Sequence, residues 1–190
     1  MPVAALSFAT PTDLNNFLGA TLDTDRAQQV LNQATALIQG WCRQNLFAVS
    51  NDVVTVDPYD TGQCFLPELP VTAVTQVQYL DCRTNTWTTL DPSFYRWNSR
   101  GKVYLTQTPD FWPWQYDTIQ VTYSHGYSTI PADLQGVCLQ IAARLFSNPY
   151  DAQGLVTGGV QMRFSGTKGT DGLKDTETAI LAKYTLIEVS

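Results

Sequence analysis

The chain has 190 residues, of which 44% are apolar and 12% aromatic, so a disordered protein is excluded and one sizeable core is expected. The net charge of −6, with lysines and arginines scattered singly, excludes nonspecific nucleic-acid binding, which needs clustered positive charge. Only 15% of the residues are charged, which indicates either a surface partly buried against other protein or an ordinary low-charge monomer.

Two helices are predicted in the first 42 residues. A short one is capped by Thr12 and stopped by Gly19, and a longer one starts near Asp23 or Thr24. Apolar residues recur in the second at three- and four-residue steps: Ala27, Val30, Leu31, Ala34, Leu37, Ile38 and Trp41. The opposite face is rich in amides and nearly free of charge, which suits either solvent or a wet contact with another protein.

Between about residues 50 and 125 the period changes to that of strands. Short alternating segments are separated by turn residues, and they are Asp52–Asp57, Gln63–Leu66, Val74–Leu80, Thr86–Leu90, Phe94–Asn98, Lys102–Leu105 and Ile119–Ser124. About seven short strands at this spacing predict a small antiparallel sandwich or barrel, inserted between two helical regions.

A third helix is predicted from Pro131, which favours the first helical position. Its apolar stripe matches that of the second helix, so the two are expected to pack as an antiparallel pair: Leu134, Val137, Cys138, Ile141, Ala142, Leu145 and Phe146. The glycine-rich segment Gly154–Gly166 then alternates like a strand or a hairpin arm. Asp175 is expected to cap a last short helix, before an extended tail, Thr185–Ser190.

The predicted class is therefore α+β: a helical bundle of two long antiparallel helices and short terminal helices, with an inserted β lobe. The predicted division is a helical part at 1–49, the β lobe at 50–125, a second helical part with the glycine-rich hairpin at 126–184, and the tail at 185–190.

Cysteine usage and the N-terminal sequence suggest the compartment. Cys42, Cys64, Cys82 and Cys138 share no C-x-x-C spacing, and two of them fall on apolar helix stripes, so buried free thiols are favoured over disulfides. The first residues do not resemble a signal peptide, and no apolar run approaches the ~20 residues of a membrane span. We expect synthesis in a reducing cytoplasm and no membrane partner.

Residues with chemical potential do not combine into a site. A triad of Ser124, His125 and Asp133 is disfavoured because adjacent side chains on a strand point to opposite faces. The aspartates match no calcium loop, and Gly158-Gly159 lacks the context of a phosphate loop. No catalytic residue, metal or cofactor is expected, and His125 is interpreted as a turn residue before Gly126.

One loop is unusually aromatic. Phe111, Trp112, Trp114 and Tyr116 lie in PDFWPWQYD between two predicted strands, stiffened by two prolines. Such a loop can fold over the open end of the β lobe, act as a hot spot for a protein partner, or stack on sugar rings.

Several segments together carry a family likeness. They are GWCRQNL at the end of the second helix, LPELPVTAVTQVQY, IQVTYSHGYSTIPADLQGVCLQIAARLFSNP, MRFSG and DTETAILAKY. In this order they resemble the head-to-tail connector (adaptor, or head-completion) proteins of long-tailed bacteriophages, over nearly the whole chain.

The resemblance implies a structural virion protein rather than an enzyme. Such proteins form a dodecameric ring under the portal, extend the DNA channel without binding DNA specifically, and present a surface to the tail. The resemblance also makes two groups of residues candidates for contacts with other proteins. For subunit or tail contacts these are Phe111, Trp112, Trp114, Tyr116, Val160, Met162 and Phe164, and for portal contacts Tyr184, Leu186, Ile187 and Val189. The alternatives are a tail-completion or terminator protein, and a carbohydrate- or receptor-binding module that uses the tryptophan-rich loop.

Overall fold

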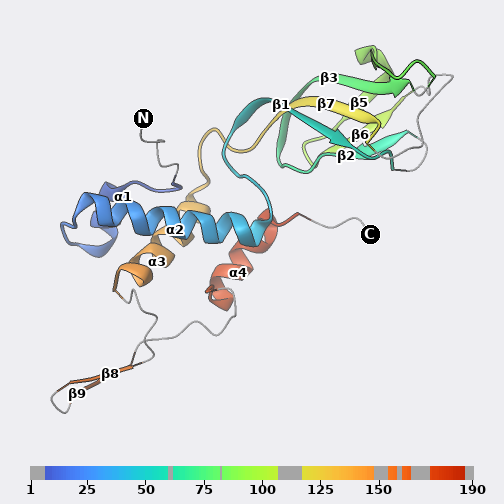
Figure 1. Ribbon diagram of the computed structural model, residues 1–190. Helices are drawn as coiled ribbons and strands as arrows, with labels where there is room; N and C mark the ends of the chain where they lie inside the picture. The colour runs from blue at the N-terminus through green and yellow to red at the C-terminus, as the bar shows by residue number, and fades with distance from the viewer. Residues whose placement is uncertain are drawn as a thin grey trace. The chain divides into compact units, whose positions relative to one another are not determined.

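The computed structural model describes residues 7–59, 62–81, 83–106, 117–147 and 172–186, and the backbone of 154–157 and 160–163 (Figure 1). The α-helices are α1 (Pro11–Leu18), α2 (Thr24–Cys42), α3 (Ala132–Ser147) and α4 (Asp175–Leu181). The strands are β1 (Val49–Val56), β2 (Gln63–Phe65), β3 (Val71–Asp81), β4 (Thr86–Thr89), β5 (Tyr95–Trp97), β6 (Lys102–Leu105), β7 (Ile119–His125), β8 (Gly154–Thr157) and β9 (Val160–Arg163). Two 3₁₀ turns, η1 (Pro92–Phe94) and η2 (Ala182–Tyr184), complete the described elements.

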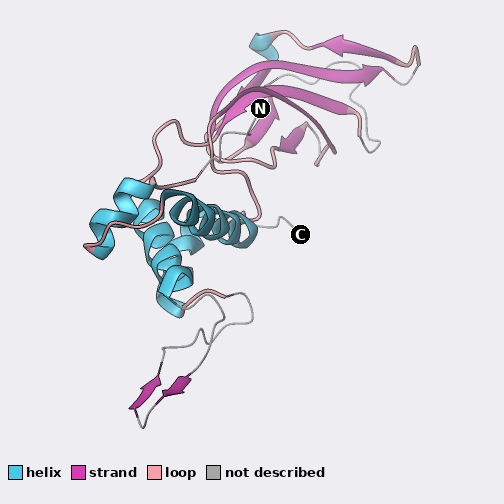
Figure 2. Cartoon of the chain, turned by 60° about the vertical axis from the view of Figure 1, so that its left-hand side comes forward, coloured by secondary structure: helices cyan, strands magenta, loops and turns pink. Residues whose placement is uncertain are grey.

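These elements form two compact units. The helical unit contains the described residues up to Arg43 and from Ile130 onward, and the strand unit is Gln44–Thr129. Figure 2 shows that helices dominate the first and strands the second. The predicted α+β class is confirmed, whereas the finer division at 1–49, 50–125, 126–184 and 185–190 stays a prediction.

The helices begin where side chains can satisfy their free N–H groups. Thr10 caps α1: its hydroxyl accepts from Asp13 N at 3.2 Å, the Asp13 carboxylate accepts from Thr10 N at 2.8 Å, and Pro11 takes the first helical position. The prediction that Thr12 caps this helix is wrong, because Thr12 lies inside the helix, two residues after the cap. Asp23 caps α2, which begins at Thr24, and this agrees with the predicted start near Asp23 or Thr24. Asp175 is the first residue of α4 rather than its cap.

The core of the helical unit lies between α2 and α3, which cross in Figure 1. It contains most of the predicted apolar stripes: Ala27, Val30, Leu31, Ala34, Ile38, Leu134, Val137, Cys138, Ile141 and Ala142. Four stripe residues are only half-buried, namely Leu37, Trp41, Leu145 and Phe146. Thr35 and Cys42 are buried in α2 instead, and the Thr35 hydroxyl lies 3.7 Å from Cys138 Sγ.

The strand unit contains the seven predicted strands as two antiparallel sheets, with orders β1-β7-β3-β4 and β2-β6-β5. The described strands form no closed barrel, so the barrel alternative of the predicted sandwich or barrel is wrong. Residues of both sheets share one apolar cluster: Cys64, Leu66, Val71, Val77, Leu90, Tyr95, Val103, Ile119, Val121 and Tyr123. The glycine-rich segment supplies a separate two-stranded sheet, β8-β9, as the alternation indicated.

A tight backbone junction closes the strand unit after β7. Tyr127 N donates to Leu46 O at 3.0 Å, Gly126 N donates to Pro70 O at 3.0 Å, and Phe47 and Tyr127 form a parallel bridge. Gly126 has a φ of +81°, and a Cβ built there would lie 2.1 Å from Phe47 O. Only glycine fits both the left-handed backbone and the close approach.

Candidate assembly surface

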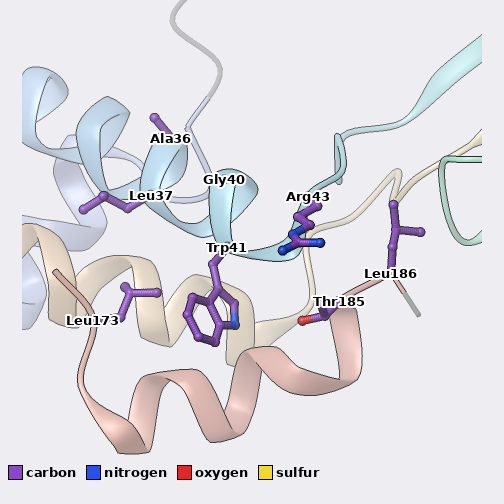
Figure 3. Close-up of a pocket in the computed structure, with 8 residues that line it drawn as sticks. All are labelled: Ala36, Leu37, Gly40, Trp41, Arg43, Leu173, Thr185 and Leu186. Carbon is purple, nitrogen blue, oxygen red and sulfur yellow. The ribbon is translucent and has the colours of Figure 1, made fainter. Parts of the chain in front are cut away.

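A hollow of about 640 Å³ opens on the helical unit beside the C-terminal part of α2 (Figure 3). Leu37, Gly40, Trp41 and Arg43 line it from the α2 side, and Leu173, Thr185 and Leu186 line it from the segments that flank α4 and η2. We call it the α2–α4 groove. Its walls are as polar as they are apolar, because Arg43 and Thr185 line it together with leucines and the Trp41 indole. Trp41 Nε1 is buried there, and no described residue forms a hydrogen bond with it.

A buried ion pair fastens α4, which lies between the lining residues Leu173 and Thr185, to α3. Arg144 Nη1 donates to Glu177 Oε1 at 2.6 Å, and Arg144 Nη2 donates to Glu177 Oε2 at 3.1 Å and to Gly172 O at 2.9 Å. Glu177 is only 1% exposed, and it also accepts from Lys174 N at 2.8 Å. The two-pronged geometry satisfies both carboxylate oxygens, which makes a buried charge tolerable.

Asp133, in the first turn of α3, holds the end of the described C-terminal region. The Tyr184 hydroxyl donates to Asp133 Oδ1 at 2.7 Å, and Lys183 forms an ion pair with the same carboxylate. Burial acts to raise the pKa of Asp133, but the hydrogen bonds from Lys183 and Tyr184 outweigh it and lower the pKa below its ordinary value of 3.8. The ionised carboxylate therefore anchors η2.

We expect this anchor to weaken in acid. Because the folded-state pKa of Asp133 is depressed, its contribution is present above pH 3.8 and is lost as the pH falls through the folded value. Asp133→Asn should lower the free energy of unfolding by about 1–2 kcal/mol at pH 7 and by almost nothing near pH 2. Urea titrations of both proteins at several pH values measure this, and a difference that stays constant with pH would contradict it.

The strand unit exposes several large aromatic side chains. These are Tyr59, Trp87, Phe94, Trp97 and Tyr104. Tyr104 lies opposite both Gln63 and Arg96 in the register of the three-stranded sheet, and Trp87 lies on the edge strand β4. Aromatic residues are enriched in protein interfaces, so these positions are candidate contacts that the sequence interpretation missed. The sequence shows the alternation of the strands, but it does not show which face of each sheet is left uncovered in the fold.

The polar face of α2 matches its sequence prediction in part. Gln29 and Gln33 are exposed, while Gln28 Nε2 donates to Asn32 Oδ1 at 2.9 Å and to Ser7 Oγ at 3.1 Å. Some of the amides are thus used within the protomer, and the others form an uncharged face.

The residues considered for catalysis do not come together. His125 is 2% exposed and its Nε2 lies 3.3 Å from Asp52 Oδ2, so its partner is not Asp133. Ser124 Oγ accepts from Asn51 N at 3.2 Å. Burial raises the pKa of the Cys42 thiol to about 11 and that of Cys64 to about 12, so both stay protonated. Cys42, Cys64 and Cys138 are free and buried, as predicted, whereas Cys82 lies outside the described residues.

Most of the predicted contact residues lie outside the described residues: Phe111, Trp112, Trp114, Tyr116, Phe164, Ile187 and Val189. Val160 and Met162 belong to β9, of which only the backbone is described. Leu186 is half-buried and lines the α2–α4 groove, while Tyr184 is buried against Asp133. Trp41 and Leu37 were predicted as core residues, so the sequence missed them as groove residues. Their half-buried position at the end of a stripe gives no distinct sequence signal.

Within the described parts of the chain, no group of three or more His, Cys, Asp or Glu residues is placed to hold a metal ion. The helices described there include none that is long and apolar enough to span a bilayer. Two small units with uncovered apolar and aromatic surface are typical of an assembly subunit.

Comparison with known proteins defines the family. The sequence profile of the head completion protein family matches residues 8–184, so the chain belongs to that family. No curated protein matches it.

Solved structures support the same fold. The chain is similar to one from the neck of a native gene transfer agent (GTA) particle computed with C12 symmetry, with a TM-score of 0.59 and 17% identity over 99% of this chain and 94% of that one. It is also similar to one from the neck of the empty GTA particle computed with C6 symmetry, with a TM-score of 0.58 and 16% identity over 100% and 95%. A chain of the native GTA virion gives a TM-score of 0.57 at 15% identity over 100% and 95%.

Proposed function

We propose that this protein is a structural component of the neck of a tailed phage or phage-like particle, where copies of it form a ring that joins the head to the tail. The observation that carries the proposal is the family match over residues 8–184, which spans both units. Support comes from the similar chains in GTA necks, one of them computed with C12 symmetry. The protein acts by shape and contact, with no chemical step.

A ring of twelve copies is the assembly we propose. It requires a heterologous interface, in which one face of a subunit meets a different face of its neighbour. The uncharged face of α2 and the β8-β9 hairpin are candidates for the two sides. The hairpin is a two-stranded sheet that pairs with no other described strand, and such sheets are marginal without a partner. Val160 and Met162 of β9, with Phe164, are therefore retained as candidate subunit contacts.

The charge of the chain suits a DNA channel. Twelve copies with a net charge of −6 carry about −72, and a wall of this sign repels DNA rather than binding it. We propose that DNA passes through the ring without specific contacts. The ring would lie between the portal and a tail-proximal neck protein, and it would assemble in the cytoplasm of the bacterial host.

The proposal predicts that particles lacking this protein accumulate as separate heads and tails. Adding the purified chain to such an extract should restore joined, infectious or DNA-transferring particles, counted by electron microscopy. A chain that restores nothing, although folded by circular dichroism, would contradict the proposal.

The tryptophan-rich loop separates this function from carbohydrate recognition. Replacing Trp112 and Trp114 by Ala should lower the yield of joined particles if the loop is a protein contact. Saccharide binding that disappears in the double variant, with joining unchanged, would favour the carbohydrate-binding module instead.

A further inference from the structure

Positive charge in the strand unit gathers on one hairpin, which β5 and β6 form. Its basic residues are Arg96, Arg100 and Lys102, and no acidic residue lies between Phe94 and Leu105. Arg96 and Arg100 are exposed, and none of the three basic residues forms an ion pair within the described parts of the chain. In a chain with a net charge of −6, this hairpin is a local exception.

The three-stranded sheet presents this charge to solvent. Arg96 pairs with Tyr104 across the register of β5 and β6, and Lys102 precedes Tyr104 by two residues, so these three side chains share one face. Val103, which lies between Lys102 and Tyr104, is buried in the core on the opposite face. Tyr104 is exposed among the cations. We call Arg96, Lys102 and Tyr104, together with Arg100 in the turn, the basic face.

The turn of this hairpin is held in place by hydrogen bonds. Asn98 Oδ1 accepts from Arg100 N at 3.0 Å and from Lys102 N at 3.2 Å, and Val71 N donates to Ser99 O at 3.0 Å. A hollow of about 360 Å³ opens beside the turn, and its lining residues are Gly62, Gln63, Asn98, Lys102, Tyr104 and Leu105. An ammonium, a phenol and amides are hydrogen-bond donors that suit a carboxylate, so the basic face fits an acidic partner.

Acidic residues lie at the other end of the same unit. Asp57 follows β1, Asp117 precedes β7 and Asp81 ends β3, and Asp117 N donates to Asp57 Oδ1 at 2.7 Å. Because these strands are neighbours in the order β1-β7-β3, the aspartates form a row across one end of the sheet, which we call the acidic row. Asp57 and Asp117 are exposed. Arg83, which follows in the β3–β4 turn, offsets only one of the three charges.

The basic face and the acidic row cannot pair within one copy. The hairpin turn is bonded to Val71, the first residue of β3, whereas Asp81 is its last residue. A strand of 11 residues spans roughly 33 Å. That separation exceeds the screening length of about 8 Å at physiological salt, so the two charged ends do not neutralise each other. Opposite charges at opposite ends are what a heterologous interface between copies requires.

We propose that the acidic partner is a second copy of this chain, so that in the ring the basic face of one strand unit contacts the acidic row of the next. This proposal rests on the ring function proposed above and adds a contact between strand units to it. In a closed ring every copy uses each of the two faces once. The contact also covers the cations of the hairpin, which leaves the ring with few positive charges for DNA to bind.

Reversing the charges of the two faces tests this contact in the full chain. One variant carries Arg96→Glu and Lys102→Glu, and the other carries Asp57→Lys and Asp117→Lys. Each variant alone sets like charges against each other at every contact, so each should join heads to tails at least about tenfold less well than the wild type. An equal mixture should restore joining, because opposite charges meet again in an alternating ring. A chain with all four substitutions should also join by itself, which controls for damage to the fold.

Crosslinking of the wild-type assembly gives a second test that needs no variant. A zero-length carbodiimide crosslink between Lys102 and either Asp57 or Asp117 is expected, and peptide mass spectrometry identifies it. Within one copy these residues are too far apart to react, so the crosslink reports two copies. Lys102 linked instead to a carboxylate of another protein would overturn the proposal.

Two results of the charge reversal would also overturn it. One is joining at the wild-type level by each reversed variant alone. The other is a loss of joining that neither the mixture nor the fourfold variant repairs, because a different acidic partner, such as another neck protein or DNA, would then occupy the basic face. The proposed neck function fails separately, if the wild-type chain does not join heads to tails.

Discussion

Replacing Glu177 by Ala is expected to lower the free energy of unfolding by about 3–5 kcal/mol. Glu177 is 1% exposed and accepts two hydrogen bonds from Arg144 and one from Lys174 N. Its removal leaves the Arg144 guanidinium, itself only 16% exposed, without its counter-charge. Loss of the pair also removes the contact that fastens α4 to α3.

The measurement is urea unfolding followed by the helical circular dichroism signal. Asp175→Ala is the matched control, because it removes an exposed carboxylate from the same helix and should cost less than about 1 kcal/mol. A double variant, Arg144→Leu with Glu177→Leu, should be more stable than Glu177→Ala, since no buried charge is left alone. If Glu177→Ala costs no more than Asp175→Ala, the ion pair does not fasten α4.

Replacing Gly126 by Ala is expected to destabilise the strand unit by about 2–6 kcal/mol, the sum of a strained backbone and a steric overlap. At a φ of +81° the new Cβ would lie 2.1 Å from Phe47 O and 3.0 Å from Ala48 N. Both atoms belong to the backbone, so neither can move aside without breaking the bond from Tyr127 N to Leu46 O.

Gly19→Ala separates the two causes of this effect. Gly19 also has a positive φ, +63°, but nothing lies within 4 Å of a Cβ built there. It should cost only about 1 kcal/mol, the conformational part alone. Thermal unfolding monitored by near-ultraviolet circular dichroism compares the two, and equal losses would show that the junction at Phe47 is not rigid.

Local patterns in the sequence predicted the elements well. Burial of one face produces a regular spacing of apolar residues in the sequence. This spacing appears as the alternation of Val54 and Val56 in β1 and as the three- and four-residue steps in α2 and α3. The seven strands and the four α-helices were therefore found with small errors at their ends. The cap of α1 was misplaced because Thr10 and Thr12 flank Pro11, and the preference of proline for the first helical position should have decided for Thr10.

Pairing between distant residues could not be predicted in the same way. β1 pairs with β7, so Val54 lies opposite Val121, and alternation defines faces but not partners. Arg144 and Glu177 are likewise far apart in sequence, and neither shows locally that it will be buried. The α2–α4 groove depends on where Thr185 and Leu186 return to α2, which is a tertiary fact. The resemblance supplied the family, whereas the candidate contact residues stay predictions.

Native mass spectrometry of the purified chain mixed with the portal of its own particle tests the central claim most directly. A complex that contains the portal ring and twelve copies of this 21.1 kDa chain is expected, with no free sites left on saturation. A portal that gains no mass, or that gains a single copy at saturating concentration, would contradict the claim that this protein is a ring-forming neck subunit.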